Sequence, residues 1–245
     1  MRAKLAVIIP AFNEEARLPR TLQRLAEYFA DQPYSTRIVV VSDGSKDRTA
    51  EITREFALQF PSIELVNSQP NRGKGFVVRK GMLEIDAEWL LMNDADLATP
   101  IEEIEKLWPS AEAGTPVVIG SRPLKESRLE VRQPWYREWL GRTFNGAVQL
   151  MAVRGIADTQ CGFKLFRQAE AREVFSRCKL DGFGFDFESL MIARDLGYPI
   201  AEIPIRWRHQ EGSKVSLLRD GTRMLLELVK LRAQGRRGRL RVRGE

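Results

Sequence analysis

Short apolar runs alternate with segments of helical periodicity along the first half of the chain. Five runs predict strands: Leu5–Ile9, Arg37–Val41, Ile63–Val66, Trp89–Met92 and Val117–Ile119. Apolar residues at helical spacing predict a helix in each of the first two gaps, carried by Leu18, Leu22, Leu25 and Phe29, and then by Ile52, Phe56 and Phe60. This order predicts an α/β fold with a mainly parallel central sheet and helices on both faces. Because ligands of such sheets bind at the carboxyl ends of the strands, the residues after each run are the candidate site.

The regular alternation lapses after residue 120. A basic loop with prolines extends to Pro134, and an aromatic, amphipathic segment covers Trp135–Val153. The remaining pattern predicts a strand at Phe163–Phe166, a helix near Phe187–Leu196, a strand at Ile200–Trp207 and a terminal helix at about Arg219–Ala233. No repeat or low-complexity linker separates the two halves, so we expect them to pack as one domain.

Composition narrows the classes of function. The chain has 245 residues, of which 43% are hydrophobic and 29% are charged, which is typical of a globular protein. Two cysteines, Cys161 and Cys178, carry no metal signature, and the single histidine, His209, disfavours Ser-His-Asp and multi-histidine zinc chemistry. With no secretory leader and no apolar window long enough to span a bilayer, the expected location is cytoplasmic.

The positive charge is concentrated at the end of the chain. The net charge is +6, and residues 219–245 hold nine basic residues against three acidic ones, so the first 218 residues are neutral. A neutral body with a basic tail favours attachment to an anionic membrane surface or to a nucleic acid. A solvated tail without a partner is the alternative.

The first three strand ends carry polar motifs. Strand one ends in Pro10-Ala11-Phe12-Asn13-Glu14-Glu15, where Asn13 is expected to cap the next helix and the two glutamates to lie in its first turn. Strand two ends in Ser42-Asp43-Gly44-Ser45-Lys46-Asp47, where Ser45 or Asp47 can start a helix. Asn71-Arg72-Gly73-Lys74-Gly75 follows strand three and suits contact with a phosphate or ribose, although it lacks the spacing of a P-loop or a dinucleotide fingerprint.

Strand four ends in Asn93-Asp94-Ala95-Asp96. In an extended segment Asp94 and Asp96 point to one side, and two neighbouring anions repel unless a divalent cation joins them. Mg²⁺ or Mn²⁺ held in this way would also take a diphosphate oxygen. The alternative is a capping pair before Thr99-Pro100.

Taken in order, these four motifs resemble the inverting glycosyltransferases of family 2, which have the nucleotide-diphospho-sugar transferase (GT-A) fold. The resemblance continues at Gly120-Ser121-Arg122, Asp158-Thr159-Gln160-Cys161-Gly162-Phe163-Lys164, Phe185-Asp186-Phe187-Glu188 and Glu211-Gly212-Ser213-Lys214. These motifs look like those of dolichyl-phosphate β-glucosyltransferases, in the wider group of polyprenyl-phosphate mannosyl- and glucosyltransferases. The resemblance covers about residues 4 to 232.

The resemblance implies a role for each matching residue. The donor nucleotide would be bound by Pro10, Ala11, Asn13, Glu14, Asp43, Lys74 and Asp94, with Asp43 at the base edge. Asp94 and Asp96 would hold the metal. The acceptor phosphate would be bound by Arg122, Arg132, Arg208, Ser213 and Lys214, and Gln160 and Lys164 would lie beside the transferred sugar. The catalytic set is thus Asp94, Asp96, Arg122, Gln160 and Lys164.

The same resemblance divides the chain into a catalytic domain at residues 1–234 and a basic tail at 235–245. Within the domain, residues 1–120 would form the nucleotide-sugar-binding half, 121–218 the acceptor half and 219–234 a terminal amphipathic helix. Two departures from the family matter. Ser42-Asp43 replaces a pair of aspartates, and Ala98 stands where mannosyl-transferring relatives often have a further polar metal ligand, which resembles the glucosyl branch.

The sequence therefore predicts inverting transfer of a hexose to a polyprenyl (dolichyl or undecaprenyl) monophosphate at the cytoplasmic membrane face, with UDP-glucose as the expected donor. Asp186 and Glu188, expected to share a side of an extended segment, would orient Lys164 or an acceptor arginine. GDP-mannose or another donor, and a soluble or glycan acceptor, remain alternatives, as does a nucleic-acid-binding protein with a basic tail. Because the family often carries a transmembrane segment that is lacking here, lipid contact would be interfacial, through the tail and the aromatic segment. The oligomeric state stays open.

Overall fold

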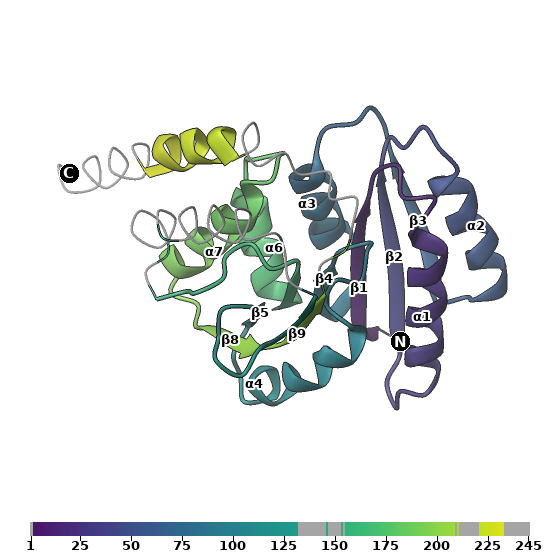
Figure 1. Cartoon of the computed structure of the whole chain (residues 1–245), viewed down its shortest axis with the longest axis horizontal. Helices are drawn as coiled ribbons and strands as arrows, with labels where there is room; N and C mark the ends of the chain where they lie inside the picture. The colour runs from purple at the N-terminus through teal and green to yellow at the C-terminus, as the bar shows by residue number, and fades with distance from the viewer. Residues whose placement is uncertain are drawn as a thin grey trace.

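The computed structural model describes residues 2–131, 146, 153, 155–208, 210 and 221–232 (Figure 1). Strands and helices alternate through the first part: β1 (Ala3–Ala11), α1 (Leu18–Ala30), β2 (Thr36–Asp43), α2 (Thr49–Gln59), β3 (Ile63–Ser68), α3 (Lys74–Glu84), β4 (Ala87–Asn93), η1 (Ile101–Lys106), α4 (Trp108–Glu112) and β5 (Val117–Ser121). The second part contains β6 (Arg128–Val131), β7 (Phe163–Arg167), α6 (Gln168–Arg177), α7 (Phe185–Asp195), β8 (Ile200–Pro204) and β9 (Arg206–Arg208). Residues 221–232 are helical.

The central sheet has seven strands in the order β3-β2-β1-β4-β7-β5-β8. All neighbours are parallel except β7, which lies antiparallel between β4 and β5. This confirms the predicted, mainly parallel sheet. Because β7 comes from the second part of the chain and separates β4 from β5, both parts contribute strands to one sheet.

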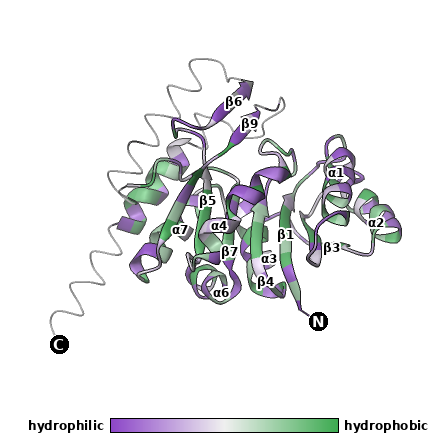
Figure 2. Cartoon of the chain, turned by 90° about the horizontal axis from the view of Figure 1, so that it is seen from below, coloured by the Kyte–Doolittle hydropathy of each residue, from purple (hydrophilic) through white to green (hydrophobic). Residues whose placement is uncertain are grey.

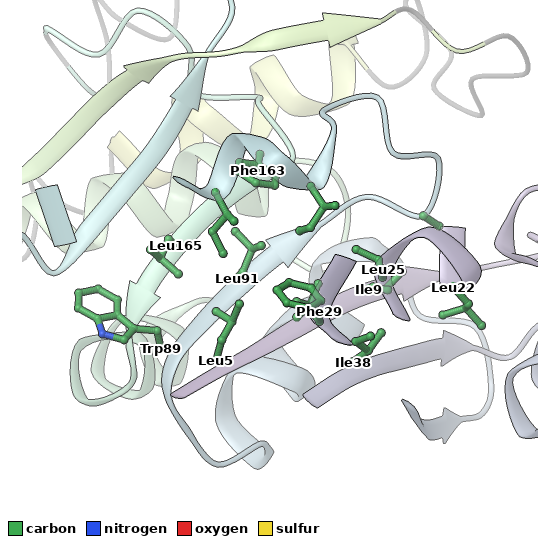
Figure 3. Packing of buried hydrophobic residues seen from close by; sticks show 14 of the residues in the cluster. Leu5, Ile9, Leu22, Leu25, Phe29, Ile38, Trp89, Leu91, Phe163 and Leu165 are labelled. Atoms are coloured by element: carbon green, nitrogen blue, oxygen red, sulfur yellow. The ribbon is translucent and has the colours of Figure 1, made fainter. Parts of the chain in front are cut away.

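Helices cover both faces of the sheet, as the hydrophobic pattern predicts. On one face, Leu22 and Leu25 of α1 join Leu5 and Ile9 of β1 in one cluster that extends to Phe163 and Leu165 of β7 (Figure 3). The other face is covered by α3, α6 and α7 in a second cluster. Coloured by hydropathy, the central strands are mostly hydrophobic (Figure 2). Burial of each large aliphatic side chain stabilises the fold by about 1.5–3 kcal/mol.

The predicted strand over Ile200–Trp207 is wrong as a single element. The chain forms β8 in the central sheet and then β9, which pairs in parallel with β6 in a separate two-stranded sheet. Pro204 closes β8 and has no backbone N–H to continue a ladder, and the side chain of Ile205 is fully buried between the two strands. The segment that contains β6 was expected to be loop.

Two local predictions are also wrong. Helix α1 begins at Leu18 with Pro19 in its first turn, so Asn13 does not cap it and Glu14 and Glu15 precede it. Asp186 and Glu188 lie in the first turn of α7, not in an extended segment, because Gly184 starts a helix whose apolar face packs on the sheet. Asp47 does accept a hydrogen bond from the Thr49 amide, at 3.0 Å, at the start of α2.

Several predictions lie outside the described residues. They are the proposed acceptor residues Arg132, Ser213 and Lys214, most of the aromatic segment Trp135–Val153, His209 and the basic tail at 235–245. Among the described helices, none is both long and apolar enough to cross a membrane.

Candidate active site

The predicted site residues meet at one edge of the central sheet. Strand register places Ala11 opposite Ser42, Asp43 opposite Ser68, Asn93 opposite Phe163, and Ser121 opposite Pro204. Since β7 runs antiparallel, its first residue lies beside the last residue of β4. The motif Asp158–Lys164 therefore reaches the same edge as Asp94 and Asp96, although more than 60 residues of chain separate them.

The loops after β1 and β2 are tied together by hydrogen bonds. Asn13 accepts from the Lys46 amide at 2.8 Å, and its own amide donates to Ser45 Oγ at 3.1 Å. The Glu14 amide donates to Thr49 Oγ1 at 2.7 Å, and its carboxylate pairs with Arg17. Together with the buried Pro10 and Ala11, these residues form a firm wall rather than a set of free side chains.

Two non-glycine residues in the described ranges have positive φ, and both follow strand ends at this edge. They are Asn13, at 52° after β1, and Leu97, at 48° after β4. Asparagine tolerates this conformation, whereas for leucine it costs on the order of 1 kcal/mol. Backbone strain is thus concentrated in the turn that carries Asp94 and Asp96, where such strain often serves function.

Asp43, at the end of β2, is buried and holds the loop after β3. Its Oδ1 accepts from the Arg72 amide at 2.9 Å, and its Oδ2 accepts from the Gly73 amide at 2.7 Å and from Asn71 Nδ2 at 2.8 Å. Gly73 has φ of 117°, and a Cβ there would lie 2.4 Å from the Asp181 carbonyl oxygen. The loop that carries Lys74 is therefore fixed from both sides.

Asp94 is held by residues from both parts of the chain. Its Oδ1 lies 2.7 Å from Lys74 Nζ at the start of α3. A Cβ on Gly162 would lie between 2.1 and 2.8 Å from the atoms of this carboxylate, so the position tolerates only glycine without displacing Asp94. This contact is a structural reason for the glycine within the motif Asp158–Lys164.

Among the described residues, no cationic side chain forms an ion pair with Asp96, and its Oδ1 accepts a hydrogen bond from the Ala98 amide at 3.0 Å. Burial, followed by the neighbouring Asp94 carboxylate, raises the pKa of Asp96 above its ordinary value. Within the described ranges, no group of three or more His, Cys, Asp or Glu side chains is placed to hold a metal. Two carboxylates nevertheless fit Mg²⁺ or Mn²⁺, since such ions commonly take one or two protein carboxylates and complete their shell with water and substrate phosphates.

A buried ion pair lies behind Lys74. The Lys164 ammonium contacts the Asp186 carboxylate and donates to the Cys161 carbonyl oxygen at 2.6 Å, and Lys164 is only 1% exposed. Burial would lower the pKa of Lys74, but the carboxylates of Asp94 and then Asp186 raise it above its ordinary value. Asp186 therefore orients Lys164, as expected, whereas a sugar could reach Lys164 only if this pair opened.

Glu188 does not take part in this pair. Its two carboxylate oxygens accept from the backbone amides of Lys179 and Leu180, at 2.9 and 2.8 Å. The expectation that Asp186 and Glu188 act together on one cation is therefore wrong.

Arg122, directly after β5, is clamped by Asp158. Its Nε and one terminal nitrogen donate to the two carboxylate oxygens at 2.6 and 2.8 Å, and its backbone amide donates to the same carboxylate at 3.1 Å. Burial alone would raise the pKa of Asp158, but Arg122 outweighs it and holds this pKa below the ordinary value. The guanidinium also lies 5.6 Å from the centre of the Trp207 ring.

Glu202 of β8 fixes the backbone of the segment that carries Asp158. Its carboxylate oxygens accept from the backbone amides of Ala157 and Asp158, at 2.7 and 3.0 Å. A chain of contacts thus runs from Glu202 through Asp158 to Arg122. Arg122 keeps a side-chain exposure of 29%, so part of this fixed cation faces solvent.

The remaining predicted residues lie around this arrangement. The Arg208 amide donates to the Ala98 carbonyl at 2.8 Å, which brings the end of β9 beside the Asp94–Asp96 turn, and its side chain pairs with Glu130. Gln160 Nε2 is buried and has no hydrogen-bond partner in the described part of the chain. Cys161 and Cys178 are buried free thiols, and burial raises the pKa of Cys161 to about 12, so it is not a nucleophile.

Sequence reasoning missed three residues that shape the site: Asp158, Gly162 and Glu202. Asp158 and Gly162 stood within a recognised motif, but their partners lie 36 and 68 residues away in the sequence. No sequence signal marks Glu202, which is one polar residue in a strand.

Comparison with known proteins places these features in a family. The model of glycosyl transferase family 2 matches residues 6–175. A dolichyl-phosphate beta-glucosyltransferase of Trichomonas vaginalis is 35% identical over 98% of this chain and 76% of its own length. The human enzyme of the same name is 35% identical over 86% of this chain and 69% of its own length, and that of Saccharomyces cerevisiae is 34% identical over 93% and 74%.

Solved structures support the fold. Glucosyl-3-phosphoglycerate synthase from Mycobacterium tuberculosis in complex with UDP superposes with a TM-score of 0.70 at 18% identity, covering 94% of this chain and 80% of that one. The same enzyme has been crystallised with Mn²⁺ and UDP-glucose. Mannosyl-3-phosphoglycerate synthase from Rubrobacter xylanophilus gives a TM-score of 0.69 at 18% identity, covering 98% and 75%. The matched family model, the similar curated proteins and the fold of the solved structures together show that this chain is a glycosyltransferase with the GT-A fold and belongs to glycosyltransferase family 2.

Proposed function

We propose that this enzyme transfers glucose from UDP-glucose to a polyprenyl monophosphate, with inversion, at the cytoplasmic face of a membrane. The observation that carries the proposal is the similarity, over 86% or more of this chain, to proteins named dolichyl-phosphate beta-glucosyltransferases. The gathering of two carboxylates and several cations at one sheet edge supports it, since both donor and acceptor carry phosphate.

The donor would bind at the ends of β1 to β4. The wall formed by Pro10, Ala11, Asn13 and Glu14 would flank the nucleoside, with Asp43 near the base. Asp94 and Asp96 would hold Mg²⁺ or Mn²⁺, which when bound supplies positive charge to the diphosphate leaving group. Lys74 lies beside Asp94 and would add its charge to the same diphosphate.

The acceptor would bind at the ends of β5, β7 and β9, in the half proposed for residues 121–218. Arg122 is already oriented by Asp158, so it would offer a cation to the phosphate without first losing rotamer freedom. Arg208 and the residues Arg132, Ser213 and Lys214 would complete this group. Gln160, whose amide nitrogen has no hydrogen-bond partner among the described residues, would donate to a sugar hydroxyl.

A phosphate acceptor also fits the absence of a suitable base among the described acids. A phosphate monoester has a second pKa near ~6 and is already anionic at neutral pH, so no side chain must deprotonate it. Asp186, the carboxylate that could have served a hydroxyl acceptor, is 3% exposed and paired with Lys164. Catalysis would rest on positioning and charge.

Membrane attachment belongs to the same proposal. The tail at 235–245 has five arginines against one acidic residue. At about 1 kcal/mol for each basic residue near an anionic surface, such a tail suffices for reversible peripheral binding, and salt weakens it. The aromatic segment Trp135–Val153 would lie in the headgroup layer.

The test is a transfer assay with a panel of donors and acceptors. UDP-glucose, other UDP-sugars and GDP-mannose are each offered with a short polyprenyl phosphate, a soluble phosphorylated acceptor or a glycan, in Mg²⁺, Mn²⁺ or chelator. We expect glucose on the polyprenyl phosphate and none in chelator. Faster transfer from GDP-mannose than from UDP-glucose would show that the proposed donor is wrong. Equal transfer to a soluble phosphorylated acceptor would show that the lipid part of the acceptor is not required. Salt-dependent RNA binding without any transfer would favour the nucleic-acid alternative.

A further inference from the structure

The helix at residues 221–232 uses one face to pack on the body of the enzyme. Met224 and Leu228, one helical turn apart, are 7% and 0% exposed and pack with Phe187 of α7. Leu231, three residues after Leu228, packs against the same cluster. In an ordinary surface helix this stripe would be the apolar face, and the rest would be polar.

The outward face is apolar instead. Leu225, Leu226 and Val229 are 40%, 62% and 51% exposed. Within the described ranges, the only other exposed large hydrophobic residue is Leu58 on α2. Val229 lies three residues after Leu226 and four after Leu225, so the three side chains form one strip of the helix. We call Leu225, Leu226 and Val229 the outer apolar strip.

Cationic residues flank the outer apolar strip. At 100° per residue, Arg223 and Lys230 fall on one side of it and Arg232 on the other. Against these three cations, the helix contains one acidic residue, Glu227, which is only partly exposed and pairs with Arg223. A second apolar strip bordered by cations is the pattern of a helix that lies in a membrane interface.

We propose that the outer apolar strip inserts into the surface of an anionic membrane, with Arg223 and Lys230 against the lipid headgroups. The charge favours an anionic lipid surface over a second copy of this chain, because two such helices would bring like charges together. The inference rests on the proposed function in one respect, since a lipid-linked acceptor places the substrate at such a surface. It also assigns attachment to a helix that contacts α7, the element that carries Asp186.

Vesicle flotation of the full chain tests the proposal. Vesicles of phosphatidylcholine with or without phosphatidylglycerol are used, without donor or acceptor, so that failure of the transferase proposal cannot affect the result. The wild-type chain should float with the anionic vesicles, and Leu226→Glu/Val229→Glu should reduce the bound fraction at least tenfold. Leu58→Glu is the control: it places one such charge on an apolar position of α2 that is 89% exposed, more than any position of the strip, and binding should stay within twofold of wild type.

Four results would overturn the proposal. They are wild-type chain that does not float with anionic vesicles, a double variant that floats like wild type, a Leu58→Glu variant that loses binding to the same degree, and a wild-type dimer that the double variant converts to monomer. Circular dichroism checks that the double variant is folded. If it is not, Leu226→Gln, at the most exposed of the three positions, is used instead and should lower binding at least threefold.

Discussion

The two parts of the sheet edge hold their charged side chains in different ways. At the ends of β1 to β3, side-chain oxygens are fixed by backbone amides of neighbouring loops, as Asp43 is by the amides of residues 72 and 73 and Asn13 is by that of Lys46. At the ends of β5 and β7, cations are fixed by buried carboxylates, in the pairs Arg122–Asp158 and Lys164–Asp186. Hydrogen bonds from loop amides fix these side chains at little cost in desolvation of charge. Buried pairs give fixed cations, which the proposed anionic acceptor would need, but removing either partner of such a pair is costly in stability.

Asp94 and Asp96 lie where the two parts meet, and changing Asp96 should have the largest effect on activity. Asp96→Asn removes the charge that would hold the metal, so transfer should fall by at least about 10³-fold. Calorimetry should show that metal-dependent binding of UDP is lost while the melting temperature stays near wild type. Glu84→Asn, on the exposed end of α3, is the control. Unchanged, metal-responsive binding of UDP to Asp96→Asn would contradict the assignment of the metal to this turn.

Breaking the Lys164–Asp186 pair should have the largest effect on stability. Both side chains are at least 95% buried, so Lys164→Met leaves an unpaired anion and should lower the free energy of unfolding by about 3–5 kcal/mol. Lys74→Met removes a cation from the more exposed pair with Asp94 and should cost only about 1 kcal/mol. Urea unfolding measures both. Equal losses would remove the distinction between the two parts of the edge.

Arg122→Met should produce a pH-dependent loss of stability. The folded pKa of Asp158 is held below its unfolded value, so its ionised form stabilises the fold above the unfolded pKa of about 4, and this contribution is lost as the pH falls through the folded pKa. The variant should therefore be less stable than wild type by about 2 kcal/mol at pH 7, and the gap should narrow below pH 4. Denaturant unfolding at pH 7, 5 and 3.5 measures the gap. A difference in stability that stays constant over this pH range would show that Arg122 does not lower the pKa of Asp158.

Asp43→Asn should have the smallest effect. The amide keeps one acceptor oxygen but lacks the charge that strengthens the hydrogen bonds from residues 71–73, so the expected cost is about 1 kcal/mol. Affinity for UDP should fall by about tenfold, as a misplaced loop would cause. Isothermal titration and thermal melting check the two effects. Glu64→Gln, on β3 away from this edge, provides the comparison, and an equal loss of UDP affinity in it would contradict the role of Asp43.

Much of the structure of residues 1–120 was predictable because its sequence signals are local. A strand is recognised from consecutive apolar residues, and parallel order places each following motif at the same edge, so Asp43, Lys74 and Asp94 were expected at one edge of the sheet, which is where the structure has them. Local patterns also gave a wrong prediction where one residue type can serve two structural roles. Asn13 has the chemistry of a helix cap but instead binds the loop after β2.

The sequence by itself determined the alternation of strands and helices, the two apolar faces of the sheet and the polar motifs at the strand ends, because each depends on residues close together in the chain. Tertiary structure alone decided the insertion of β7 between β4 and β5, the packing of Gly162 against Asp94, and the support that Glu202 and Asp158 give to Arg122. These contacts join residues that are 36 or more positions apart. Strand order and burial decide which carboxylate pairs with which cation, and neither of them produces a periodic pattern in the sequence.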